Sequence, residues 1–155
     1  MNYIRPAAAA DASRIAEIIV TNYRVNFYPF FKNDKYYFGE LNVLDTAAEY
    51  AEGTRDLKNT FVYDDGVVKG FIRVCEKELE KLFVEPQFQN NRIGEMLLAY
   101  AVRELGAERL WVLEYNKRGM EFYRRHGFEL TGEKMTEDGW IPLLRMDYKG
   151  IKKMR

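Results

Sequence analysis

The chain has 155 residues, with 24 basic and 24 acidic side chains and a formal net charge of zero at pH 7. A balanced charge argues against a dedicated nucleic-acid-binding protein, which usually carries a basic excess. A single cysteine, Cys75, and a single histidine, His126, exclude an internal disulfide and a Cys/His zinc site. No apolar run approaches the ~20 residues that span a bilayer, and the N-terminus has no signal-peptide pattern. We therefore expect a cytoplasmic protein with neither a membrane nor a nucleic-acid partner.

The first third of the chain predicts one short strand, two helices and an aromatic segment. The strand is expected at residues 2–5, and Asp11 can cap the first helix. Apolar residues then recur at helical spacing, namely Ile15, Ile18, Ile19 and Tyr23. Residues 25–44 are expected to be irregular, because they are crowded with aromatic side chains. A second, shorter helix is expected from about residue 46 to residue 54.

The rest of the chain alternates strands with helices. Strands are expected at residues 60–63, 67–75, 78–84, 110–115, 128–135 and 141–148, and helices at residues 92–105 and 119–125. Strands with interspersed helices indicate an α+β (mixed α/β) domain around a twisted, mostly antiparallel sheet. We expect one domain over residues 1–148, followed by a basic C-terminal tail at residues 149–155.

One chemical feature is a strand that leads through a polar loop into a long helix, over residues 82–98. Free backbone N–H groups at a helix N-terminus form a ready anion site. Asn90 and Asn91 tolerate left-handed conformations, Gly94 lets a ligand approach the backbone, and Arg92 could contact a phosphate. The plain alternative is an ordinary loop before a helix. No Lys-Ser/Thr pair follows the glycine, which excludes a P-loop.

A second feature follows the strand at residues 110–115. Asn116 ends this strand, a short helix carries Phe122 and Tyr123, and the next strand starts after Gly127. Together with Gln89 and Gly94 of the polar loop, this pattern closely resembles the GNAT superfamily of N-acetyltransferases, over nearly the whole chain. The resemblance implies a GNAT-like sheet of about seven strands flanked by about four helices. One departure is that Arg92 stands where the family's loop pattern has its first glycine.

The resemblance implies acetyl-CoA as co-substrate, with no metal. Its pantetheine arm would lie between the fourth and fifth strands, and backbone N–H groups of the polar loop would hold the pyrophosphate. The cofactor-binding residues implied in this way are Phe83, Val84, Gln89, Asn90, Asn91, Arg92, Ile93, Gly94, Glu95, Asn116 and Tyr123.

The resemblance also implies direct attack of an amine on the thioester, with Tyr123 as the general acid that protonates the departing thiolate. The amine must be neutral to attack, so a base or a water chain has to take its proton. Glu80 is our first choice of base, Glu78 is the second and Glu114 is a third candidate. The plain alternative for each glutamate is a solvated surface carboxylate.

We expect an N-acetyltransferase that acts on a primary amine of a small molecule or of a protein N-terminus. The alternative is a catalytically inactive acyl-CoA-binding sensor or regulatory module. A third interpretation is an interaction domain that uses the aromatic side chains of residues 23–38, a segment that builds the acceptor site in GNAT proteins. Dimerisation is common in the family, so a homodimer is an option.

Overall fold

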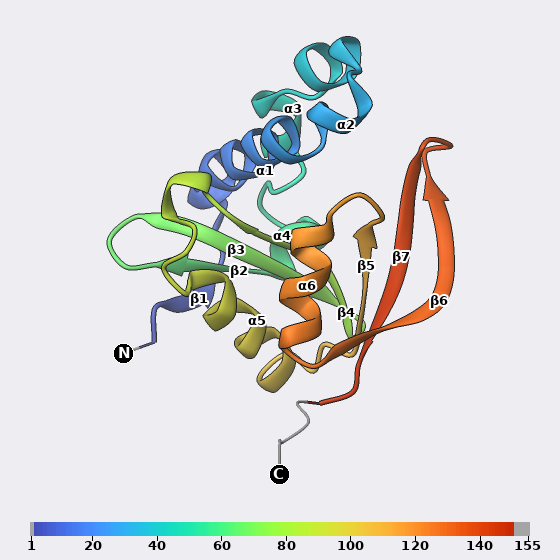
Figure 1. The fold of residues 1–155 in the computed structure, drawn as a ribbon. Helices are drawn as coiled ribbons and strands as arrows, with labels where there is room; N and C mark the ends of the chain where they lie inside the picture. The colour runs from blue at the N-terminus through green and yellow to red at the C-terminus, as the bar shows by residue number, and fades with distance from the viewer. Residues whose placement is uncertain (1, 151–155) are drawn as a thin grey trace.

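A seven-stranded sheet organises residues 2–150, which are the part of the chain that the computed structural model describes (Figure 1). The strand order is β1-β2-β3-β4-β5-β7-β6. The strands are β1 (Ile4–Pro6), β2 (Thr60–Asp64), β3 (Val68–Cys75), β4 (Glu78–Val84), β5 (Arg109–Leu113), β6 (Phe128–Glu137) and β7 (Ile141–Tyr148). All neighbours are antiparallel except β4 and β5, which are parallel. The expected mixed α/β class and the mostly antiparallel sheet are confirmed.

Helices cover both faces of this sheet. They are α1 (Ala12–Asn26), α2 (Tyr28–Phe31), α3 (Val43–Ala48), α4 (Arg55–Lys58), α5 (Ile93–Arg103) and α6 (Lys117–Arg125), with short turns η1 (Ala9–Asp11), η2 (Tyr36–Glu40) and η3 (Pro86–Phe88). Leu97 and Leu98 of α5 and Met120 of α6 pack into one buried cluster. Ile15 and Ile18 of α1 pack into a second cluster. Apolar faces of α1, α5 and α6 thus anchor the two sides of the sheet. None of the described helices is long and apolar enough to cross a membrane.

The segment after the first helix differs from the sequence prediction. Residues 25–44 were expected to be irregular, but α1 continues to Asn26 and is followed by α2 and η2. The helix predicted at residues 46–54 is also wrong, because the chain forms α3 and α4 instead. The side chain of Asn42 caps α3 and that of Thr54 caps α4, while Gly53 between them has a left-handed φ of 81°. The caps therefore begin α3 before residue 46 and α4 only after residue 54, and Gly53 lies in the turn between the two helices. The basic tail predicted at residues 149–155 lies outside the described residues from residue 151 onward.

The sheet splits between its two parallel strands. Only Glu78↔Arg109 and Leu79↔Leu110 pair β4 with β5, after which the strands diverge, and α6 lies in front of them in Figure 1. The register between β3 and β4 shifts between Arg73 and Val74, so Glu80 is an extra residue in the ladder. Such a bulge bends a strand and increases its twist. The edge of β4 that faces β5 is therefore free of a strand partner beyond Leu79.

Candidate active site

Two cavities meet where β4 and β5 separate. The first, which we call the strand cavity, has a volume of about 460 Å³, and β4, β5, η2 and the β6–β7 hairpin contribute to its wall. The second, the loop cavity, has a volume of about 500 Å³ and lies between the end of β4, the start of α5 and α6. Five residues line both cavities: Phe27, Leu82, Phe83, Asn116 and Tyr123. Both volumes suit a small ligand or part of a larger one.

The loop before α5 presents free backbone donors to the loop cavity. Asn90 and Arg92 have φ angles of 68° and 65°, in the left-handed region. From Asn90 onward, Met96 is the first residue whose backbone N–H has an acceptor in the described chain. It donates to the Arg92 carbonyl oxygen. The N–H groups from Asn90 to Glu95 have no such acceptor. Successive unpaired N–H groups beside a helix N-terminus form an anion-binding concavity.

The predicted loop residues surround this cavity with one exception. Its wall includes Phe83, Val84, Gln89, Asn90, Arg92, Ile93, Gly94 and Glu95, but not the exposed Asn91. The Gln89 side chain donates a 3.2 Å hydrogen bond to the carbonyl oxygen of Val84, which ties the loop to the end of β4. A Cβ added to Gly94 would lie 3.6 Å from the Phe122 ring and 3.8 Å from a Val84 methyl group, which is ordinary contact. Packing of the protein itself therefore does not require glycine there.

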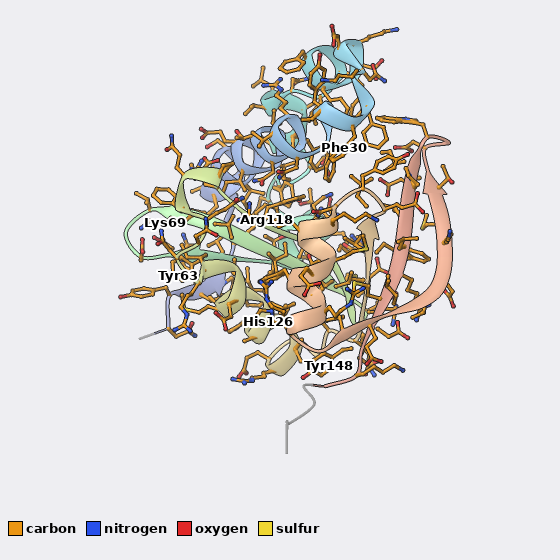
Figure 2. All side chains as sticks on the ribbon, viewed as in Figure 1. Phe30, Tyr63, Lys69, Arg118, His126 and Tyr148 are labelled. Carbon is orange, nitrogen blue, oxygen red and sulfur yellow. The ribbon has the colours of Figure 1, made fainter. Side chains whose placement is uncertain are left out.

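Positive charge gathers around the loop cavity. Arg92, Arg118 and Arg125 line it, and Arg118 donates a 3.1 Å hydrogen bond to the side chain of Asn90. Arg92 does not fill the loop, since its side chain is 83% exposed and its Nε lies 3.5 Å from a Glu95 oxygen. Figure 2 labels Arg118 and His126, which belong to opposite ends of α6. His126 ends that helix, with its Nδ1 2.7 Å from the carbonyl oxygen of Phe122.

Asn116 and Tyr123 lie at the junction of the two cavities. The Asn116 side chain accepts a 2.9 Å hydrogen bond from the backbone N–H of Gly119 and so caps α6. Tyr123 projects from α6, and its ring packs edge-on against Phe122 and Phe128. Burial raises the pKa of Tyr123 to about 12, so its hydroxyl keeps its proton across the physiological range.

Glu78 and Glu80 both line the strand cavity, but their carboxylates differ in how closely basic side chains contact them. Glu80 accepts hydrogen bonds of 3.1 and 2.6 Å from Arg55 and one of 2.9 Å from Arg73. Burial by itself raises the pKa of Glu80, but the two arginines outweigh burial and the net shift is downward. Glu78 is less engaged, since its Oε1 lies 3.8 Å from the Nε of Arg109. Glu114 is not among the cavity residues, and its carboxylate lies 3.9 Å from the Lys134 ammonium.

Three strand-cavity residues were not singled out from the sequence. Lys81 of β4 donates a 2.6 Å hydrogen bond to the Tyr23 hydroxyl, and Tyr36 and Tyr37 of η2 line the same cavity. The available signal for Lys81 was its place in the strand predicted at residues 78–84, directly before the apolar run Leu82–Val84. The tyrosines were part of an aromatic-rich segment, and nothing in its pattern separates those that face a cavity from those that pack.

Comparisons with known proteins indicate an acetyltransferase family. Residues 56–130 match the model of the acetyltransferase (GNAT) domain family. The "Peptidyl-lysine N-acetyltransferase YjaB" of Salmonella typhimurium is 29% identical over 89 residues, which are 56% of this chain and 61% of that protein. The "Uncharacterized N-acetyltransferase MJ1207" of Methanocaldococcus jannaschii is 36% identical over 74 residues, 44% of this chain and 31% of that protein. The match thus spans less than two thirds of the length of either relative.

Solved structures share the whole fold. The solution structure of apo-form YjaB from Escherichia coli has a TM-score of 0.75 at 21% identity, covering 95% of this chain and 97% of that one. The PaiA N-acetyltransferase of Thermoplasma acidophilum, solved in complex with coenzyme A, has a TM-score of 0.61 at 21% identity, covering 94% and 98%. The family model over residues 56–130 supports the GNAT superfamily, and the solved structures share the fold. The chain's named relatives are N-acetyltransferases.

Proposed function

We propose that the protein is an N-acetyltransferase that moves an acetyl group from acetyl-CoA to a primary amine of a small molecule or of a protein N-terminus. One observation carries this proposal: Tyr123, a partly buried tyrosine whose pKa is raised to about 12, lies at the junction of a donor-rich loop cavity and a second cavity. A transferase needs such a junction, because its two substrates have to meet. The YjaB relatives, named as peptidyl-lysine acetyltransferases, support a primary amine as acceptor.

The loop cavity fits the anionic end of acetyl-CoA. The free N–H groups from Asn90 to Glu95 would bind the pyrophosphate, and Arg118 and Arg125 would add positive charge. The edge of β4 at Phe83 and Val84 has no strand partner and would pair with the amides of the pantetheine arm, beside the Val84 carbonyl that accepts from the Gln89 and Asn22 side chains. Gln89 and Asn116 would act indirectly, by fixing the loop and the start of α6.

Acetyl-CoA supplies an activated acyl thioester. In the transfer, the amine nitrogen bonds to the acyl carbon, the carbon–sulfur bond breaks and its electron pair leaves with sulfur. The Tyr123 hydroxyl would give its proton to that sulfur. A glutamate or a water molecule would take the proton that the amine loses.

The two strand glutamates are not equal candidates for the base. Glu80, our first choice from the sequence, is held by two arginines that lower its pKa, and this makes it a weak proton acceptor. Glu78 lines the same cavity with only a 3.8 Å contact to Arg109. We therefore propose Glu78 as the base and Glu80 as a residue that holds the bulged part of β4 in place.

Tyr123→Phe tests the proposal, with Tyr100→Phe as its matched control. Tyr100 is a partly buried tyrosine of α5 that packs on Phe61, away from both cavities. CoA release is followed with a panel of primary amines that includes lysine peptides, and acetyl-CoA binding is measured by calorimetry. We expect Tyr123→Phe to lower kcat by roughly 10²–10⁴-fold with binding retained, and Tyr100→Phe to change neither. Unchanged turnover in Tyr123→Phe would contradict the acid role, whereas acetyl-CoA binding without transfer to any amine would favour a sensor.

A further inference from the structure

We propose that the acceptor is a small primary amine that also carries a carboxylate, and that Lys81 and Tyr37 bind this carboxylate in the strand cavity. The inference rests on the proposed acetyl transfer and adds the chemical class of the acceptor. It starts from two side chains in this cavity, an ammonium without a counter-charge and a buried hydroxyl without an acceptor.

Lys81 is the ammonium. It donates a 2.6 Å hydrogen bond to the Tyr23 hydroxyl and lies over the Tyr23 and Phe83 rings, 5.2 and 5.8 Å from their centroids. Burial lowers its pKa, but the Tyr23 hydroxyl more than offsets this and the net shift is upward, so the side chain remains charged. No carboxylate of the described chain pairs with it. Partly buried cations ordinarily have such a partner.

The neighbouring charged side chains pair with one another and not with Lys81. Arg73 contacts both Glu80 and Asp56, at 2.9 and 3.2 Å, and Arg55 contacts the same two carboxylates. Two positive and two negative groups therefore balance each other next to Lys81. Glu78 and Glu137 also line the strand cavity, but neither forms an ion pair with Lys81, so its ammonium has no paired carboxylate among the described residues.

Tyr37 is the hydroxyl. Its residue is 1% exposed, and its Oη is the buried side-chain atom without a hydrogen-bond partner among the described residues. Burial first, and then the nearby Tyr36 and Tyr23, raise its pKa to about 12, so it is a donor at neutral pH. An unsatisfied buried donor is costly and rare. Tyr37 and Lys81 line one cavity, where a single bound carboxylate would accept hydrogen bonds from both.

The surroundings of the cavity suit a small acceptor. Trp140, at the β6–β7 turn, packs edge-on against Phe31, Tyr36 and Tyr37 with ring centroids 4.9, 5.4 and 6.1 Å apart. Phe30, labelled in Figure 2, stacks on Tyr115 at 5.4 Å. The Trp140 contacts connect the α2–η2 segment to the β6–β7 hairpin, and the Phe30 contact connects it to the loop after β5; Tyr36 and Tyr37 of this segment line the strand cavity. A cavity of about 460 Å³ bounded in this way accepts a small molecule more readily than a folded protein surface.

The test measures binding, so it does not depend on turnover. Glycine, β-alanine, 4-aminobutyrate and the common L-amino acids, each beside its carboxamide, are titrated calorimetrically into CoA-saturated protein. CoA release from acetyl-CoA is followed with the same panel. The variants are Lys81→Met, Lys81→Arg and Tyr37→Phe, and the controls are Lys58→Met, an exposed lysine of α4, and Tyr100→Phe.

We expect at least one carboxylate to bind more tightly than its carboxamide by about tenfold or more, the range of a hydrogen bond to a charged group. Lys81→Met should remove this preference, Lys81→Arg should restore part of it, and Tyr37→Phe should weaken binding of the carboxylate alone. The controls should keep the full preference. Equal binding of carboxylates and carboxamides, no binding of either, or an undiminished preference in folded Lys81→Met would overturn the inference. Failure to bind CoA or to acetylate any amine would instead defeat the proposed function.

Discussion

Leu79 and Leu110 are the last paired residues between the parallel strands β4 and β5. Beyond this pair, the backbone of β4 from Glu80 to Val84 has a partner strand on one side only. Buried backbone donors and acceptors need partners, so an open edge inside a domain is suited to an extended ligand. The same separation creates the two cavities that share Tyr123. One local feature of the sheet thus accounts for both proposed substrate positions.

Gly94→Ala tests the loop cavity. The added methyl group makes only ordinary contacts with Phe122 and Val84, so we expect the free energy of unfolding to stay constant or to rise, by up to about 1 kcal/mol from helix propensity. Because the methyl group takes space at the cavity wall, acetyl-CoA should bind at least tenfold more weakly. Gly39→Ala is the control, since a Cβ there contacts nothing within 4 Å. Full affinity in folded Gly94→Ala would show that acetyl-CoA does not approach this wall.

Arg92→Gly tests how much stability the chain loses by having Arg92 where the family's loop pattern has a glycine. Arg92 has a φ of 65°, a conformation that is unfavourable for a residue with a Cβ, and its side chain is 83% exposed. Glycine should therefore raise the free energy of unfolding by about 1 kcal/mol in denaturant titrations. Arg103→Gly, at an exposed helical position in α5, should lower it instead. A loss of stability in Arg92→Gly would mean that the side chain makes a stabilising contact that outweighs the backbone strain.

Tyr37→Phe and Tyr50→Phe should have opposite effects on stability, although both tyrosines are fully buried. The Tyr37 hydroxyl has no hydrogen-bond partner within residues 2–150, so its removal should leave the free energy of unfolding unchanged or raise it by up to about 1 kcal/mol. The Tyr50 hydroxyl accepts a 2.7 Å hydrogen bond from Arg73, so its removal should cost about 1 kcal/mol or more. Equilibrium unfolding at pH 7 measures both changes.

The same Tyr37 variant should resist alkaline unfolding. The pKa of Tyr37 is about 12 in the folded chain against an ordinary value of 10.0. Its neutral form contributes stability that is fully present below pH 10 and is lost as the pH rises from 10 towards 12, because the unfolded chain ionises first. The stability of Tyr37→Phe should therefore fall less than that of the native chain over this interval. Parallel curves for the two proteins would contradict the assignment of a buried, neutral Tyr37.

Glu80→Gln and Glu78→Gln should separate structure from catalysis. The arginines lower the pKa of Glu80 below its ordinary value of 4.5. The resulting stability is present above pH 4.5 and is lost as the pH falls through the folded-state pKa. Glu80→Gln should therefore be less stable than the native chain at pH 7, by roughly 1–3 kcal/mol, and the difference should shrink in acid. Glu78→Gln should keep its stability and lose turnover, and the reverse outcome would restore Glu80 as the base.

The sheet and the loop before α5 could be predicted from the sequence because their signals are local. Turn residues, alternating apolar positions and the Asn-rich loop before Gly94 each act over a few neighbours. The segment over residues 25–54 could not, because its helices are set by side-chain caps at Asn42 and Thr54 and by aromatic contacts with the distant Trp140. The ion pairs that engage Glu80 were equally invisible, since Arg55 lies 25 residues away in the sequence.

Calorimetric titration of the purified protein with acetyl-CoA, with adenosine diphosphate as the comparison ligand, tests the central claim most directly. The account predicts saturable binding in the micromolar range, far tighter than that of adenosine diphosphate, because the loop cavity and the open edge of β4 would both be used. It also predicts that Gly94→Ala weakens this binding. If correctly folded protein bound acetyl-CoA no better than adenosine diphosphate, the assignment of an acetyl-CoA-dependent transferase would be contradicted.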